Sequence, residues 1–335
     1  MQNRLYRRFF VFAIATFVVF SLILVLPVSR AADEKKVVLY TAITATTSQI
    51  PLWYAVKEEW PKGYALHVEY WKNLDDLRGT MLARKGDIWV GDLKGFAQAA
   101  KRGAPVTLVA VTAWKKFYFV ASGKETAATL EGIADDLRKT GEKLAVAPQD
   151  GPAPGILEKI RSKNGPAFEV APMAPQQLML EMIRGSRRYA LIPEPFLSSL
   201  LAKKPDVRIV ASLEEEFARH FGGKARLPLA GIAVNTAFAK ANPEMLAKLV
   251  RAMQVAELRL AGKPKEAAAL LPKQVRDTLG IDVIEASLAR DLIHVETAWQ
   301  AREQIADFLQ MVMPELRKSA KDGLPSDSFI LPEPK

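Results

Sequence analysis

The chain has 335 residues, of which 49% are apolar and 25% are charged, and it contains no cysteine. This composition excludes a disordered chain, a collagen-like repeat, a disulfide scaffold and any thiol nucleophile, and the length favours two lobes because single cores stop growing beyond about 250 to 300 residues. The net charge is +10. Its basic residues form only pairs such as Arg187-Arg188, which argues against nucleic acid as a partner.

The start of the chain has the pattern of an export signal. Arginines precede an apolar run from Phe9 to Leu26, and Pro27 with the small residues Ser29 and Ala31 follows. A basic flank, an apolar stretch and a small-residue site in this order are typical of a secretory signal peptide. We therefore predict a signal peptide at residues 1–31. An uncleaved membrane anchor is the alternative, because the run is nearly long enough to span a bilayer.

From Lys36 onward, short apolar runs alternate with helical periodicity, which is typical of an α/β architecture. Predicted strands cover residues 37–40, 66–71, 87–90, 106–111, 117–121, 143–147, 170–171, 190–192 and 207–211. Predicted helices cover residues 51–60, 74–84, 130–139 and 176–183, with a further helix between residues 151 and 164. Residues 81–88 and 182–190 both pass from a helix end through glycine into a strand, which predicts matching units in the two lobes.

The C-terminal third has a different pattern. Apolar residues follow a helical period from Pro243 to Gly262, and again from Glu285 to Met311 through Trp299. No strand is predicted there. We expect these helices to cover the first lobe, with Trp299 and the methionines in its core.

Motifs for catalysis or metal binding are missing from the sequence. His67, His220 and His294 have no metal-type partner at the required spacing, and there is no G-x-S-x-G elbow, phosphate loop or dinucleotide fingerprint. The acidic runs Glu214-Glu215-Glu216 and Asp75-Asp76 are interpreted as solvated helix ends. The sequence thus predicts no catalytic residue, no metal and no cofactor.

Polar, aromatic and turn-forming residues follow the predicted strands at their C-terminal ends, where an open α/β sheet forms its ligand crevice. In the first half these segments are Thr44 to Ser48, Trp71 to Asn73, Gly91-Asp92 and Trp114. In the second half they are Gln149 to Gly151 and Pro193 to Phe196. One crevice between two lobes would receive them all, which favours a ligand site over a series of unrelated turns.

Several motifs, in their order along the chain, resemble those of the periplasmic solute-binding proteins of ABC importers. They are Ile50-Pro51-Leu52-Trp53-Tyr54-Ala55, Arg84-Lys85-Gly86-Asp87-Ile88, Gly103-Ala104-Pro105-Val106, Gln149-Asp150-Gly151, Ile183-Arg184-Gly185, Pro193-Glu194-Pro195-Phe196 and Leu324-Pro325-Ser326-Asp327-Ser328-Phe329. The chain is most similar to the branch that serves aliphatic sulfonates, taurine, nitrate and thiamine-precursor pyrimidines. It departs from that branch at Arg188, where an acidic residue is usual, and in its Thr-rich segment after the first strand.

The resemblance implies a two-lobed periplasmic-binding-protein-like fold, in which each lobe is a mixed sheet flanked by helices and two hinge crossovers join the lobes. The hinges are expected near residues 117–121 and 229–234. Residues 36–120 with 230–335 would form the first lobe, and residues 121–229 the second. The resemblance also implies a periplasmic monomer that holds a small molecule and delivers it to a permease in the inner membrane.

Within this fold, nine residues are predicted to bind the ligand across the cleft: Thr46, Thr47, Trp71, Asp92 and Trp114 from the first lobe, and Gln149, Asp150, Gly151 and Glu194 from the second. An anionic or zwitterionic ligand would suit the amides near Gly151, whereas the three carboxylates and the tryptophans would suit a cationic or neutral aromatic group. Two alternatives to transport remain at this point. They are a membrane-tethered sensory module and an exported hydrolase with an unrecognised nucleophile.

Overall fold

The computed structural model describes residues 34–124, 126–319 and 322–333, so the predicted signal peptide lies outside the described residues. The chain divides into residues 1–35 and residues 36–335, and the fold below is that of the second unit. Within the described ranges, no helix has both the length and the apolar character that are needed to cross a bilayer.

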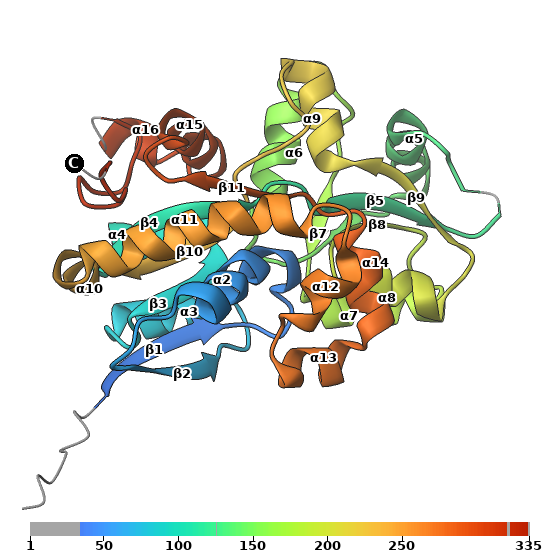
Figure 1. The fold of residues 1–335 in the computed structure, drawn as a ribbon. Coiled ribbons are helices and arrows are strands. Elements are labelled where there is room, and N and C mark those ends of the chain that lie inside the picture. The colour runs from blue at the N-terminus through green and yellow to red at the C-terminus, as the bar shows by residue number, and fades with distance from the viewer. Residues whose placement is uncertain (1–33, 125, 320–321, 334–335) are drawn as a thin grey trace, which may run out of the picture. The chain divides into compact units, whose positions relative to one another are not determined.

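The strands form two mixed sheets, as predicted for an α/β chain (Figure 1). In order across the sheet, the strands of the six-stranded first sheet are β11 (Ile293–Thr297), β4 (Val106–Ala113), β10 (Ala230–Asn235), β3 (Ile88–Asp92), β1 (Lys35–Thr41) and β2 (Tyr64–Tyr70). Those of the five-stranded second sheet are β7 (Val170–Pro172), β6 (Leu144–Val146), β8 (Tyr189–Pro193), β5 (Phe117–Ser122) and β9 (Val207–Ser212).

Each sheet has a strand in its middle that is antiparallel to both neighbours, and in the first sheet this strand comes from beyond the second sheet in the sequence. β10 follows the whole second sheet in sequence, yet it lies between β3 and β4 and is antiparallel to both. In the same way, β5 lies between β8 and β9 and is antiparallel to both. The chain therefore passes between the sheets twice, at residues 114–116 and 222–229. The two passages directly precede β5 and β10, next to the positions predicted for the hinges, and both strands are fully paired.

Helices cover both faces of each sheet. The first lobe is defined here as the first sheet with α2 (Thr46–Glu59), α3 (Leu74–Leu82), α4 (Leu93–Lys101), α10 (Thr236–Ala241) and α11 (Pro243–Leu260). The second lobe is the second sheet with α5 (Leu130–Thr140), α6 (Ala153–Arg161), α7 (Pro175–Arg184), α8 (Phe196–Lys203) and α9 (Leu213–Phe221). The units α3–β3 and α7–β8 occupy corresponding places in the two lobes, which confirms the predicted match.

Alternation along the strands divides the core between the two faces of each sheet. In β3, Ile88 and Val90 pack in the cluster that includes α2 and α11, whereas Trp89 packs in the cluster that includes Phe96 of α4. In the second sheet, Val120 packs toward α7 and α8 and Phe119 toward the opposite face. These buried side chains fix the register of both sheets.

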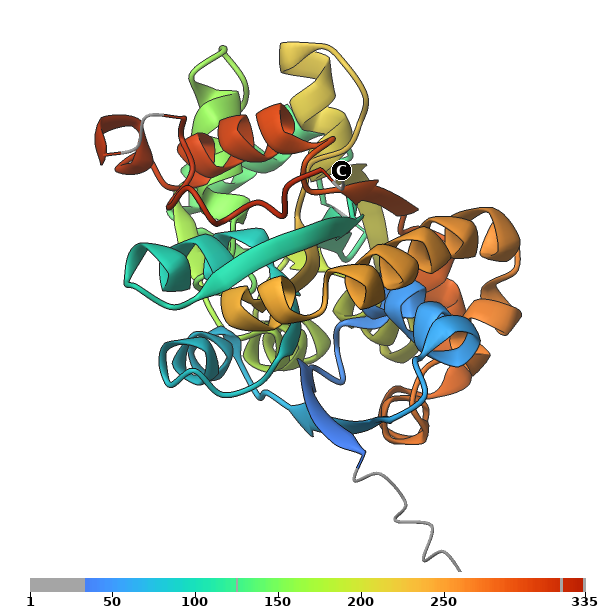
Figure 2. The same ribbon diagram turned by 60° about the vertical axis from the view of Figure 1, so that its left-hand side comes forward.

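The tail differs from the prediction in two ways. Its elements are α12 (Pro264–Ala269), α13 (Lys273–Leu279), α14 (Ile281–Leu288), β11, α15 (Arg302–Val312) and α16 (Leu316–Ser319). The predicted helix over residues 285–311 is therefore wrong, because the β-branched residues of β11 pair with β4 at the sheet edge. The tail also contacts both lobes: α14 packs against α8, and α15 lies between α4 and α6 (Figure 2). Trp299 is half-buried against the core, as expected.

Substitution of Gly231, the second residue of β10, tests the pairing of the inserted strand. A Cβ atom at this position would lie 2.1 Å from the carbonyl oxygen of Ala110, so we expect Gly231→Ala to lower the free energy of unfolding by about 1–3 kcal/mol through overpacking. Urea denaturation measures the change. As a control, Gly79→Ala in α3 meets no atom within 4 Å and should raise stability by up to about 1 kcal/mol through helix propensity. A Gly231→Ala variant as stable as the parent would contradict the register.

Candidate functional site

A cavity of about 270 Å³ lies between the two lobes, at the C-terminal ends of the strands. Its first-lobe wall is formed by Thr44, Ala45, Ser48, Trp71, Lys72, Asn73, Leu74, Asp75, Gly91 and Asp92. Its second-lobe wall is formed by Phe117, Pro148, Gln149, Asp150, Pro152, Ala174, Pro175, Gln176, Pro193, Glu194 and Phe196. Lys116, Leu229 and Ala230 close it where the chain passes between the lobes. This is the place at which open α/β sheets bind ligands.

Five of the nine predicted residues line this cavity: Trp71, Asp92, Gln149, Asp150 and Glu194. The indole N–H of Trp71 donates to the carbonyl oxygen of Val90 at 2.9 Å, which fixes the ring beside the end of β3. Asp92 caps α4 by accepting a hydrogen bond from the backbone N–H of Gly95 at 2.8 Å. Its other carboxyl oxygen, Oδ2, is buried without a hydrogen-bond partner among the described residues, and burial raises the pKa of the carboxyl.

The other four predicted residues do not line the cavity. Thr46 and Thr47 lie in the first turn of α2, which begins before Pro51 and not at it, and both are buried. Their hydroxyl groups turn to the tail, where Thr46 contacts Ser287 and Thr47 donates to Asp291. They therefore hold the tail against α2.

Trp114 and Gly151 are also used within the chain. The indole of Trp114 is fully buried and donates to the carbonyl oxygen of His294 at 2.8 Å. Gly151 closes a turn by donating to the carbonyl oxygen of Pro148 at 3.0 Å, and its own carbonyl oxygen accepts from Nζ of Lys94 at 3.0 Å. Its amide is thus not a free donor for an anion.

Lys116 is a cavity residue that the sequence did not reveal. Its backbone N–H donates to Glu214 at 3.1 Å and its carbonyl oxygen accepts from the N–H of Glu194 at 2.9 Å. The ammonium group has no ion pair or hydrogen bond within the described part of the chain. The only sequence signal for this role would have been its position between two predicted strands, β4 and β5, that belong to different sheets.

Contacts across the cavity hold the two lobes together on one side. Arg78 of α3 lies 3.6 Å from Asp150 of the second lobe, and Lys94 of α4 donates to Gly151 in the same loop. Arg78 also pairs with Asp75 at 2.6 Å. The loop that carries Gln149 and Asp150 is therefore fastened to two helices of the first lobe.

A second set of contacts lies at the opposite side, where the turn after α14 reaches the second lobe. Nη1 of Arg290 lies 3.2 Å from Glu194 and 3.0 Å from the hydroxyl of Ser198. The hydroxyl of Tyr118 donates to the carbonyl oxygen of Arg290 at 2.8 Å. Glu194 therefore joins the cavity wall to the tail.

Three buried carboxyls surround Lys116 at the base of the cavity. They are Glu194, Glu214 and Asp291. Burial raises the pKa of all three, and raises that of Asp291 to about 8. Glu214 is fully buried and accepts the N–H groups of Lys116 and Phe117. The interpretation of residues 214–216 as a solvated helix end is therefore wrong, because Glu216 is also buried.

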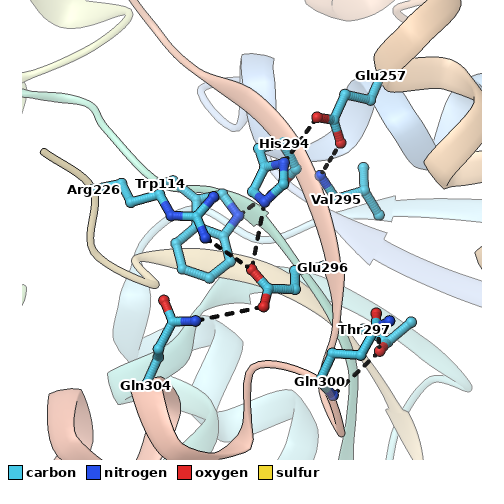
Figure 3. A network of polar contacts seen from close by, with 9 residues as sticks. All are labelled: Trp114, Arg226, Glu257, His294, Val295, Glu296, Thr297, Gln300 and Gln304. Atoms are coloured by element: carbon cyan, nitrogen blue, oxygen red, sulfur yellow. Dashed lines mark hydrogen bonds and ion pairs between the residues drawn. The ribbon is translucent and has the colours of Figure 1, made fainter. Parts of the chain in front are cut away.

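Behind the two passages, a polar network ties them to β11 and α11 (Figure 3). The imidazole of His294 lies between Glu257, at 2.8 Å, and Glu296, at 3.4 Å. Arg226 pairs with Glu296 at 3.3 Å and covers the ring of Trp114 at 4.7 Å from its centroid. Predicted to lie on a helix, His294 belongs to β11 instead. Within the described residues, no cluster of His, Asp and Glu side chains has the arrangement of a metal site.

Comparison of the whole structure with solved structures finds the same two-lobed fold in binding components of ABC-type import systems. An ABC transporter protein from Parabacteroides distasonis aligns with a TM-score of 0.66 at 18% identity, over 90% of this chain and 100% of that one. The periplasmic aliphatic sulphonate binding protein of Escherichia coli gives 0.63 at 13% identity, over 90% and 95% of the two chains.

The periplasmic nitrate-binding protein of Synechocystis PCC 6803 gives a TM-score of 0.62 at 12% identity, over 86% of this chain and 84% of that one. No protein-family model and no curated protein matches the sequence. The comparisons confirm the predicted fold, two mixed sheets flanked by helices, and find it in proteins that are named for binding a sulphonate and nitrate.

Asp291→Asn tests the buried carboxyls at the base of the cavity. Because the pKa of Asp291 is about 8 in the folded protein, the folded state keeps a proton that the unfolded chain releases. The stability that this retained proton contributes is fully present below the pKa of an exposed aspartate, and it is lost as the pH rises toward 8. The free energy of unfolding should fall by up to about 1.4 kcal/mol per pH unit in that window.

The variant should reduce this slope in urea denaturation at a series of pH values. It should not abolish the slope, since Glu194 and Glu214 act in the same direction. Asp135→Asn, at an exposed ion pair with Arg138, is the matched control and should leave the slope unchanged. An unaltered slope in Asp291→Asn would refute the assignment.

Proposed function

We propose that the chain is the exported solute-binding component of an ABC-type importer, which captures a small polar molecule between its lobes and delivers it to a permease in the inner membrane. The observation that carries this proposal is the cavity itself. Both lobes line it, and Arg78, Lys94 and Arg290 make contacts from one lobe or the tail to the other lobe at its edges. A ligand would replace water between the lobes and add its own contacts to these, which would favour the closed form.

The solved structures with this fold support the same function. Two of them are named for the solutes they bind, an aliphatic sulphonate and nitrate. We infer that this chain likewise binds and releases its ligand without reacting with it. In support, no histidine is among the described residues that line the cavity, and the whole sequence has no cysteine.

The remaining parts of the proposal follow from the sequence. We infer export to the periplasm through residues 1–31, and a monomer whose only other partner is the permease. The two bodies that move would be the two lobes, close to the predicted division into residues 36–120 with 230–335 and residues 121–229. Because β5 pairs within the second sheet, we place it in the second body, with the changes of backbone angle at residues 114–116 and 222–229.

Small molecules retained by the protein test this function. After gentle purification, denaturation should release one compound in about equimolar amount, detected by mass spectrometry. Adding that compound back at about 100 times its dissociation constant should stabilise the protein by about 2.7 kcal/mol in a thermal unfolding experiment.

A substitution that fills the cavity provides the matched test. Ala174 lines the cavity at the start of α7, so Ala174→Trp should abolish both the retained compound and the stabilisation. Ala261→Trp, at an exposed position after α11, should change neither. If the parent retains nothing and no candidate solute raises its unfolding temperature, the transport function is refuted.

A further inference from the structure

The helix starts at the second-lobe wall are poor binding sites for an anion. An anion at a helix start is held by free backbone N–H groups, and proline has none. α6 begins after Pro152 and has Pro154 in its first turn. α7 begins with Pro175, and α8 follows Pro195. In α8 the N–H of Ser198 is already taken by the carboxylate of Glu194 at 3.0 Å.

Two helix starts of the first lobe, those of α3 and α4, are capped by side chains, whereas α2 has no side-chain cap. Asn73 accepts the N–H of Asp76 at the start of α3, and Asp92 accepts that of Gly95 at the start of α4. At the start of α2, the hydroxyl of Thr47 donates to the carboxyl of Asp291. A carboxyl of the protein therefore already stands where an oxyanion would approach α4.

Acidic side chains outnumber basic ones among the described residues that line the cavity. Among the described residues of the second lobe, the cavity is lined by Asp150 and Glu194 but by no lysine or arginine. In the first lobe, Asp75 and Asp92 outnumber the exposed Lys72. The remaining cation at the cavity, Lys116, lies near the buried carboxyls of Glu194 and Asp291.

Asp92 has an unmet requirement for a donor. Its Oδ2 is buried without a partner among the described residues, and it lies against Gly95, where a Cβ would come within 2.6 Å. A buried acceptor without a donor lowers the stability of the folded protein. An N–H group or a positive charge brought to this wall would offset that cost, because a cation also favours the ionised carboxylate.

The rest of the cavity suits a flat apolar body. Trp71, Phe117, Phe196 and the prolines of the second lobe line it. Its volume is about 270 Å³, whereas a dry cavity of about 150 Å³ already admits benzene. One ring with a small substituent therefore fits, and aromatic faces also attract a cation.

From these observations we propose that the captured molecule is a compact organic cation, an amine or amidine on a flat ring, and not an oxyanion. This inference rests on the proposed function and specifies the chemistry of its ligand. Asp92, whose Oδ2 has no partner among the described residues, is the residue that sets the preference for charge.

Three probes of one shape and different charge test the inference: benzamidinium, benzamide and benzoate, with methanesulfonate as a second anion. Isothermal titration calorimetry of the full exported chain, dialysed free of retained solute, measures each affinity. We expect benzamidinium to bind at least about tenfold more tightly than benzoate or methanesulfonate, the ratio that a single charged hydrogen bond supplies. Benzamide should lie between them.

Asp92→Asn is the variant that isolates the charge, because asparagine keeps the oxygen that caps α4. It should weaken the binding of benzamidinium by about tenfold and leave that of benzamide within about twofold. Asp135→Asn, which removes the same charge from an exposed pair on α5, should change neither. The thermal unfolding midpoint of each variant shows that it is folded.

Three results would overturn the inference. They are tighter binding of benzoate or methanesulfonate than of benzamidinium, equal losses for benzamidinium and benzamide in Asp92→Asn, and no binding of any probe. None of these results contradicts the proposed function. That function fails only if the purified protein retains no solute and gains no stability from any added solute. The two failures are thus distinguishable.

Discussion

The hydrogen bonds between the two passages of the chain are the constraint on which the rest of the structure depends. The N–H of Leu227 donates to the carbonyl oxygen of Trp114 at 2.8 Å, and that of Leu229 to Ala113 at 3.1 Å. These bonds hold the two segments side by side, so that β10 enters the first sheet and β5 the second as antiparallel strands in the middle. The first lobe is then completed by β10, a strand from beyond the second lobe, and the carboxyl ends of both sets of parallel strands face one cavity.

The same segments explain why so many carboxyls are buried at one place. A peptide that leaves one sheet before entering the next has N–H groups without strand partners, and buried N–H groups need acceptors. Glu214 supplies them for Lys116 and Phe117, while Glu194 does so for Ser198 and also pairs with Arg290. The cost of desolvating these carboxyls appears as their raised pKa values. The base of the cavity is therefore rigid, polar and sensitive to charge.

Much of this arrangement could be predicted from the sequence, and the failures have physical causes. The alternating strands and helices up to residue 211 were visible because each strand is a short apolar run between turn residues. β11 was missed because Leu288, Leu292, Val295 and Trp299 also fit a helical period, although Ile293, Val295 and Thr297 alternate with His294 and Glu296 as a strand does. Trp71, Asp92 and Glu194 were found at the cavity because they follow strand ends. Trp114 was misplaced because sequence does not show that Arg226 covers its ring.

The tail has a consequence for how the lobes move. α15 packs against α4 of the first lobe and α6 of the second, and a single apolar cluster runs through Phe96, Phe308 and Ile156 from one to the other. At Gly155 of α6 the helices α6 and α15 approach so closely that a Cβ atom would lie 3.0 Å from the backbone of Val312 in α15. This apolar contact resists separation, since parting the helices would expose their apolar surfaces to water. We therefore expect the lobes to part on the side of the cavity away from α15, with this apolar contact kept.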